Sequence, residues 1–305
     1  METKRFFPRR ELKEEGRASL SGHWGKAIVI ILIGALISGI PSIVNFNTQM
    51  GSIDFENMNT AMYASQVQPD AGTALLGILL SLLSAVLIAA YTMATSKWYL
   101  DLVQKNPNIS LGDFFGNFSL AGKGILAWLW MSLWMFIWML IPVAIFIAAM
   151  MLGGAAMFAS DGSSGGTFVF FLLMLAAFAV YIGIAIWKGY SYGQIFNVIA
   201  DSPNIGVRDA MRYSIAMTKD YIMDLFILDL SFILWGLLII VTLGLAAFYV
   251  GPYMASAQAM AYFFLRDQAL DRGLLSPQEF GLEKQRVREE PIVEEPYMDE
   301  TIEKE

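Results

Sequence analysis

A single carboxylate interrupts a long apolar stretch in the C-terminal third of the chain. Residues 225–238 read LFILDLSFILWGLL, and Asp229 is the one charged side chain among them. If a membrane-spanning helix begins near Tyr221, Asp229 lies about 12 Å along it, close to the middle of a bilayer. A charged Asp at that depth costs about 2.5–3.5 kcal/mol on insertion scales. We therefore expect it to have a partner or a function.

Two interpretations of Asp229 stay open. In the first, the carboxyl group is structural. It is then either protonated or clamped by hydroxyl groups such as those of Ser231 and Thr242, or by the N-terminal end of a broken helix. In the second, it binds a ligand or a proton. No Lys or Arg lies in the stretches predicted to span the membrane, so we expect no salt bridge at membrane depth, which favours a neutral Asp229.

Two further acids precede Asp229. Asp220 and Asp224 are four residues apart, on one face of the helix near the inner surface, where interfacial chemistry at a helix end explains them. Five residues separate Asp224 from Asp229, about 140° around a helix, so the two do not naturally chelate one cation. The candidate intramembrane polar site consists of Asp229, Ser231 and Asp224.

Aromatic side chains form a second candidate. Residues 128–139, WLWMSLWMFIWM, contain half of the eight Trp residues of the chain. Trp130, Trp134 and Trp138 recur every fourth residue and so lie on one helix face, running from the interface towards mid-membrane. They either face lipid and pack helices together, or line an aromatic groove for an acyl chain or an apolar peptide.

Several chemistries lack the residues that they need. The chain has no Cys, so disulfides and thiolate sites are excluded. His23, the only His, lies beside Trp24 without clustered carboxylates, so we expect no metal. No Gly-x-Ser-x-Gly step or phosphate-cradling loop is present, and Asp229 is the only acid at depth. We expect no cofactor and no enzymatic activity.

Composition indicates a membrane protein. Hydrophobic residues make up 56% of the 305 residues and charged residues only 15%, whereas a soluble domain has about 25% charged residues. The net charge of −7 is concentrated at the C-terminal end, because residues 282–305 contain nine acids and four bases. Such a tail is expected to be solvated and able to dock a protein partner. No basic surface points to nucleic acid.

The basic residues are absent from three stretches, 27–96, 124–187 and 220–265. Each suits two spans and an outer turn, because about 20 residues cross the hydrocarbon core. The turns are predicted at the polar segment 45–71, at the Gly/Ser loop 153–166 and near Thr242–Leu245, with Pro252 as a kink in the last helix. The predicted spans are about 27–44, 72–95, 124–152, 167–187, 222–242 and 246–265. Both termini are then cytoplasmic, by the positive-inside rule.

The segments between the hairpins resemble one another. PNISLGDFF (107–115) and PNIGVRDAM (203–211) share Pro-Asn-Ile and an Asp in register, and LKEEGRASL (12–20) is similar in type to 207–215. The predicted fold is all-α and polytopic, with three hairpins that each follow a cytoplasmic amphipathic helix in a pseudo-threefold repeat. Residues 1–26 form the first such helix, 27–265 the transmembrane domain and 266–305 a cytoplasmic acidic tail.

The N-terminal helix has a narrow apolar stripe of residues spaced four apart, namely Leu12, Gly16, Leu20 and Trp24. Its bases lie elsewhere on the helix, so it is expected to rest on the inner membrane surface near anionic head groups. Arg17, Leu20 and Trp24 are the candidate interfacial residues. The helix serves either as a topology anchor or as a specific lipid or partner site.

Two segments resemble a known family. RRELKEEGRASLSGHWGKAI resembles the opening motif of the bacterial domain of unknown function 975 family, in which a Leu-x-Gly-x-Trp-Gly step precedes the first span. DLFILDLSFILWGLL, the following TLG, and YVGPYMASAQAMAYFFL are similar to its last hairpin, where Asp-Leu-Ser-Phe and Pro-Tyr steps recur. The resemblance covers about residues 8–266. It implies a bacterial plasma-membrane protein and supplies no activity, ligand or catalytic residue.

Two function classes stay open. The buried Asp, the Trp ladder and the repeats favour a protein that binds or moves an amphiphile, such as a lipid, an apolar peptide or a drug. The alternative is a non-catalytic membrane partner in assembly, immunity or stress responses, which docks proteins through its cytoplasmic helices or acidic tail.

Overall fold

The computed structural model describes residues 5–51, 71–104, 106, 108–159 and 164–280, and every regular element in them is helical. The prediction of an all-α protein is confirmed for this part of the chain. The α-helices are α1 (Arg9–Ser19), α2 (Trp24–Gly51), α4 (Ala71–Val103), α5 (Leu111–Gly116), α6 (Ala121–Ala159), α7 (Ser164–Tyr192), α8 (Ile195–Asp201), α9 (Val207–Thr218), α10 (Ile222–Leu230), α11 (Ile233–Val241) and α12 (Ala247–Asp271), with a 3₁₀ turn at Asn117–Leu120.

Four helical segments of the described chain are long and apolar enough to cross a membrane. They are Ala74–Val103, Leu111–Ala159, Gly165–Asp201 and Ile222–Val241. A fifth becomes possible if α1 and the first part of α2, which meet at 98°, are counted together. The predicted last span, 246–265, lies in α12, which is not one of these segments. The six predicted spans therefore stay a prediction.

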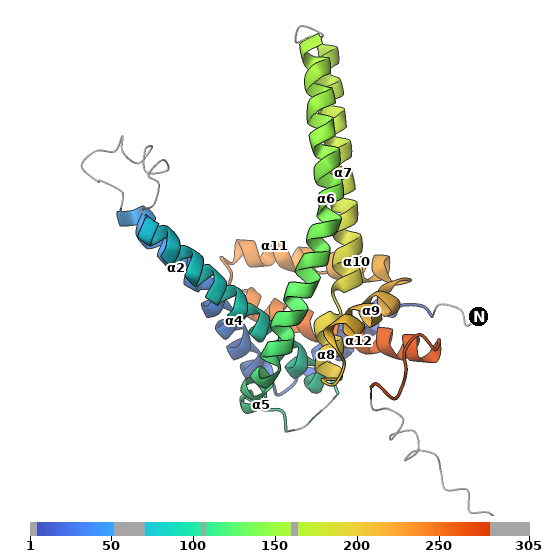
Figure 1. Cartoon of the computed structure of the whole chain (residues 1–305). Helices are drawn as coiled ribbons and strands as arrows, with labels where there is room; N and C mark the ends of the chain where they lie inside the picture. The colour runs from blue at the N-terminus through green and yellow to red at the C-terminus, as the bar shows by residue number, and fades with distance from the viewer. Residues whose placement is uncertain (1–4, 52–70, 105, 107, 160–163, 281–305) are drawn as a thin grey trace, which may run out of the picture.

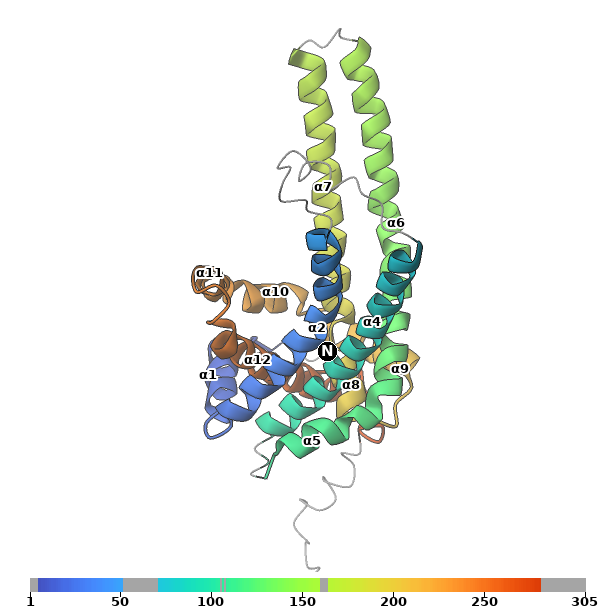
Figure 2. The same ribbon diagram turned by 90° about the vertical axis from the view of Figure 1, so that its left-hand side faces the viewer.

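The α6–α7 hairpin projects far from the rest of the molecule (Figures 1 and 2). The predicted loop at 153–166 is wrong over most of its length, because α6 continues to Ala159 and α7 begins at Ser164. Gly153 serves packing. A Cβ atom on Gly153 would lie 2.8 Å from the Phe170 ring, and small residues let apolar helices approach closely.

The core lies at the base of the hairpins, where α4, α8, α9 and α12 meet. Trp98 of α4 and Tyr262 of α12 are fully buried there. Ala257, Ala259 and Ala261 of α12 are also buried, and their small side chains let neighbouring helices pack closely on α12. This base holds the ends of the apolar helices in fixed positions relative to one another.

Helix α1 packs along α12 through the predicted apolar stripe. Leu12, Gly16 and Leu20 are buried, and the Trp24 ring stacks on Tyr249 at 4.9 Å. A Cβ atom on Gly16 would lie 2.8 Å from the backbone nitrogen of Ala257. The stripe is therefore used in protein packing, which corrects the expectation that it rests on lipid. The basic side of α1 includes Arg17. Its contact with anionic head groups stays a prediction.

The last hairpin contains a turn where we predicted it and a break that we did not predict. The chain turns after Thr242, with positive φ angles of 51° at Leu243 and 92° at Gly244. The apolar segment before it, predicted as one span over 222–242, is interrupted at Ser231–Phe232, between α10 and α11. In both views α10 and α11 lie across the axis of the α6–α7 hairpin (Figures 1 and 2).

A short helix occurs before the first helix of each predicted hairpin. Helix α1 precedes α2, α5 precedes α6, and α9 precedes α10. In the two similar Pro-Asn-Ile segments, α5 begins at Leu111 and α9 at Val207, which are equivalent positions in the alignment of the two. This order of elements agrees with the pattern expected from the sequence, and the threefold repeat itself stays a prediction.

Candidate functional site

A cavity of about 470 Å³ lies where α7, α8, α10 and α12 meet. Five polar side chains line it: Tyr190, Gln194, Asn197, Asp229 and Gln258. The space opens where α7 ends at Tyr192 and the chain turns through Gly193 and Gln194 before α8. A Cβ atom on Gly193 would lie 3.1 Å from the Gly189 carbonyl oxygen, so a larger residue would crowd this turn.

Asp229 accepts one hydrogen bond on each carboxylate oxygen. The Tyr190 hydroxyl donates to Oδ2 at 2.7 Å, and Gln258 Nε2 donates to Oδ1 at 3.1 Å. Both donors are neutral, and they come from α7 and α12. Each carboxyl oxygen is therefore within hydrogen-bond distance of one neutral donor. The acid therefore connects three helices and at the same time lines the cavity.

The partners that we expected for Asp229 bond elsewhere. The Ser231 hydroxyl donates to the Leu228 carbonyl oxygen at 2.5 Å, and the Thr242 hydroxyl donates to the Leu238 carbonyl oxygen at 2.8 Å. Each of these carbonyl oxygens also accepts the backbone N–H of the same residue, Ser231 or Thr242, so both hydroxyls are used in local helix-end bonds. The proposed hydroxyl clamp is wrong in its residues, since a phenol and an amide hold the carboxylate instead.

A base from the N-terminal helix reaches the break beside Asp229. Lys13 Nζ donates to the Ser231 hydroxyl oxygen at 3.1 Å and lies 4.4 Å from the centre of the Phe232 ring. Burial lowers the pKa of Lys13. The Asp-Leu-Ser-Phe step therefore connects the cavity with α1. Asp229 lines the cavity, and Ser231 and Phe232 contact α1. Sequence reasoning missed Lys13, which it placed among the membrane-surface bases.

Asp224 lies outside the cavity. It is on α10, like Asp229, but the cavity lining does not include it. Asp220, four residues earlier, forms an ion pair of 2.7 Å with Arg272, just after α12. The structure thus separates the three residues of the predicted polar site. Asp229 lines the cavity, Ser231 contacts α1, and Asp224 lies outside the cavity.

The Trp ladder, which consists of Trp130, Trp134 and Trp138, contacts α7 at one end. Trp130 and Trp134 meet edge to face at 6.2 Å, and Trp138 meets Trp187 of α7 at 5.8 Å. The Lys188 ammonium lies 3.7 Å from the centre of the Trp138 ring. Trp138 therefore contacts a base at the end of α7, and the depth of these Trp residues in a membrane stays a prediction. None of the three ladder residues lines either cavity found in the described chain.

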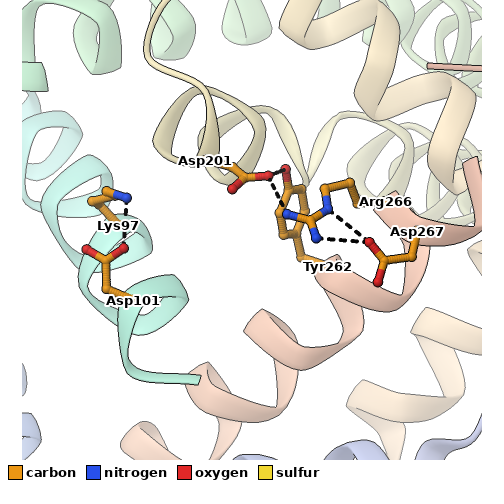
Figure 3. Close-up of polar contacts among 6 residues, drawn as sticks. All are labelled: Lys97, Asp101, Asp201, Tyr262, Arg266 and Asp267. Atoms are coloured by element: carbon orange, nitrogen blue, oxygen red, sulfur yellow. Dashed lines mark hydrogen bonds and ion pairs between the residues drawn. The ribbon is translucent and has the colours of Figure 1, made fainter. Parts of the chain in front are cut away.

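A buried ion pair fixes two of the cavity helices to each other. Arg266 Nη1 of α12 lies 3.0 Å from Asp201 Oδ2 at the end of α8, and the Tyr262 hydroxyl donates to the same oxygen at 2.9 Å (Figure 3). Only about an eighth of each charged side chain is exposed, at 13% and 12%. Arg266 also pairs with Asp267. A second ion pair, between Lys97 and Asp101, lies within α4 and is less buried (Figure 3).

Sequence reasoning missed this ion pair. Asp201 and Arg266 each follow an apolar run, which is consistent with a helix end in water. Nothing in the sequence pairs two residues 65 positions apart.

A second cavity of about 380 Å³ lies between α1, α4 and α12, and Glu15, Ser19, His23 and Asn106 are among its lining residues. The ring of His23 is 3.1 Å from the Ser21 carbonyl oxygen. Within the described residues, no group of three His, Asp or Glu side chains could hold a metal ion. The Asp229 cavity combines polar and apolar lining residues, which suits binding.

One family matches the chain. It is described as "Protein of unknown function (DUF975)", and the match covers residues 1–269. No curated protein and no solved structure matches the chain.

Proposed function

The chain belongs to the family of unknown function DUF975. We propose that it binds or moves an amphiphile at the Asp229 cavity. The proposed protein is a multi-pass component of a bacterial plasma membrane with both termini in the cytoplasm. It has six spans in three hairpins and no catalytic activity. The long apolar helices support the membrane location in its general form.

The cavity itself is the observation that carries the proposal. Apolar side chains, those of Ala185, Ile186, Leu225, Leu228 and Ala261, share the lining with the polar ones. A mostly apolar cavity with a few convergent polar groups is the usual form of a small-molecule site. Its volume is within the range of about 300–1,000 Å³ that such sites have. An amphiphile suits this mixed lining, because its chain can contact the apolar side chains while its head group meets Asp229.

Native mass spectrometry of the full chain in mild detergent tests the proposal. Wild-type protein is expected to carry a discrete bound mass, and Asp229→Asn is expected to lose it while remaining folded. Asp224→Asn is the matched control, because it removes the same charge from the same helix outside the cavity. That variant should keep the bound mass.

Two results would contradict the proposal. One is a wild-type protein without a discrete adduct. The other is an adduct that Asp229→Asn retains at the wild-type level. In either case Asp229 would act only as a tie between helices. The alternative of a non-catalytic partner protein would then be favoured, and removal of the acidic residues 282–305 would be the next change to make.

A further inference from the structure

The charge of the Asp229 cavity selects among amphiphiles, and this inference rests on the proposed function. Asp229 is the only carboxylate that lines the cavity, and no Lys, Arg or His lines it. The other polar lining residues are neutral amides and a phenol. An anionic head group would therefore meet a carboxylate at short range without a base to offset it, whereas a cation would be attracted.

Three basic residues on or beside the cavity helices are engaged elsewhere. Lys188 precedes the lining residue Gly189, but its ammonium lies over the Trp138 and Trp187 rings, at 3.7 and 4.0 Å from their centres. Lys13 donates to Ser231. Arg266, on the same helix as Gln258, pairs with Asp201. Among the described residues, Asp229 forms no ion pair, so its charge is left for a ligand.

The carboxylate keeps room for another donor. Its two oxygens offer about four acceptor positions, and Tyr190 and Gln258 occupy one on each oxygen. The Gln194 side-chain oxygen, which accepts from Asn197 Nδ2 at 2.8 Å, is a second acceptor on the cavity wall. An ammonium group has three N–H donors and no acceptor, which suits a wall of acceptors around one negative charge.

We propose that the cavity binds an amphiphile whose head group is an ammonium, with Asp229 as its counter-ion. Two sources share this chemistry, the ammonium of an ethanolamine phospholipid and that of a free long-chain amine. A charge-assisted hydrogen bond to the carboxylate holds the nitrogen. The alkyl chain lies against Ile186, Leu225 and Leu228.

Protection of a single cysteine tests the charge preference. The chain has no Cys, so Ala185→Cys places the only thiol on the cavity wall without altering a polar lining residue. The full chain is reconstituted in phosphatidylcholine nanodiscs and labelled with membrane-permeant N-ethylmaleimide. The probes are dodecylammonium, dodecyl sulfate and dodecyl maltoside, which share one alkyl chain. Ser119→Cys, exposed and away from the cavity, is the control for probe effects on the membrane.

Dodecylammonium is expected to slow labelling at Ala185→Cys about tenfold more than the other two probes, the ratio that one charge-assisted hydrogen bond contributes. The difference should vanish in Asp229→Asn and persist in Asp224→Asn. Nanodiscs with phosphatidylethanolamine distinguish the sources. Slow labelling there without any probe identifies the phospholipid, and unchanged labelling identifies a free amine.

Equal protection by all three probes would overturn the ammonium preference while leaving amphiphile binding in place. Stronger protection by dodecyl sulfate would overturn it as well. Failure of every probe to protect Ala185→Cys, with Ser119→Cys labelling normally, would overturn the proposed function itself.

Discussion

Asp229 is held by two donors that are distant from it in sequence. Tyr190 and Gln258 are separated from it by 39 and 29 residues, and both are uncharged. An acid with neutral donors on both oxygens is stabilised without a salt bridge, and hydrogen bonds between membrane helices contribute about 0.6–2 kcal/mol each. The same two bonds orient the carboxylate towards the cavity, so structural and binding roles coincide in one side chain.

Removal of the Tyr190 hydroxyl tests the structural part of this arrangement. We expect Tyr190→Phe to lower the free energy of unfolding by about 1 kcal/mol, because Asp229 loses one of its two donors. The ring contact with Phe226, at 6.3 Å, is kept. Unfolding in mixed micelles measures the difference. Tyr181→Phe, at an exposed position of the same helix, is the control, and an equal loss there would contradict the role of the hydroxyl.

The sequence identified Asp229 but did not identify its partners. Its position was sufficient to identify the acid, because a carboxylate inside an apolar run is easily recognised and is costly to bury in a membrane. Local spacing suggested Ser231 and Thr242 as partners, and both hydroxyls bond to backbone carbonyls three or four residues earlier in the chain. The true donors come from helices that only the tertiary fold brings together, so no pattern of spacing points to Tyr190 or Gln258.

At the scale of elements, α1 determines where the last hairpin is interrupted. It lies along α12 through Gly16, and Lys13 contacts both residues of the break between α10 and α11. The N-terminal segment adds a further connection, because Arg5 and Asp271 form an ion pair of 3.1 Å. The position of α10, and with it the position of Asp229, therefore depends on a helix more than 200 residues away in sequence.

A methyl group at Gly16 should separate α1 from α12. Gly16→Ala would place Cβ 2.8 Å from the Ala257 backbone nitrogen, and backbone cannot rotate away. Overpacking of this kind costs about 1–3 kcal/mol, so we expect a lower melting temperature and faster proteolysis of the N-terminal segment. Gly25→Ala, where nothing lies within 4 Å, is the matched control and should be neutral or slightly stabilising. Equal behaviour of the two variants would contradict the close contact.

Elements were predictable where local signals decide them. The turn after Thr242 follows from the length of the apolar run and from Gly244, which has a positive φ. The loop at the tip of the α6–α7 hairpin was predicted too long, because Gly and Ser usually indicate loops in water. In a membrane, backbone groups must bond internally, and helices continue through Gly153. The break at Ser231 had no local signal, since its contact comes from α1.

At the scale of the whole molecule, the proposed six-span topology places loop positions on opposite sides of the membrane. Single cysteines in the cysteine-free chain test this with a membrane-impermeant maleimide in intact cells. We expect Gly154→Cys and Leu243→Cys to label from outside, and Ser119→Cys and Ser276→Cys to label only after permeabilisation. Ser119, Leu243 and Ser276 lie at or near turns of the described chain, and Gly154 lies in the last two turns of α6.

Leu243→Cys carries the decisive result for this topology. The side chain of Leu243 is 95% exposed, so its accessibility reports on the side of the membrane that it reaches. Labelling of Leu243→Cys only after permeabilisation would mean that α10 and α11 do not cross the membrane. The topology would then have four spans, in agreement with the orientation of α10 and α11 across the other hairpin (Figure 2).

The contact of Lys188 with Trp138 and Trp187 has a consequence for bilayer thickness. An ammonium flanked by Trp rings marks the level of the head groups, and α7 begins at Ser164, 24 residues earlier. At 1.5 Å per residue that length is about 36 Å, whereas the hydrocarbon core is about 30 Å thick. The apolar residues of α7, 168–187, account for about 30 Å of this length and match the core, so the extra turn at 164–167 lies at the level of the head groups. A bilayer with shorter acyl chains should therefore make the hairpin lean.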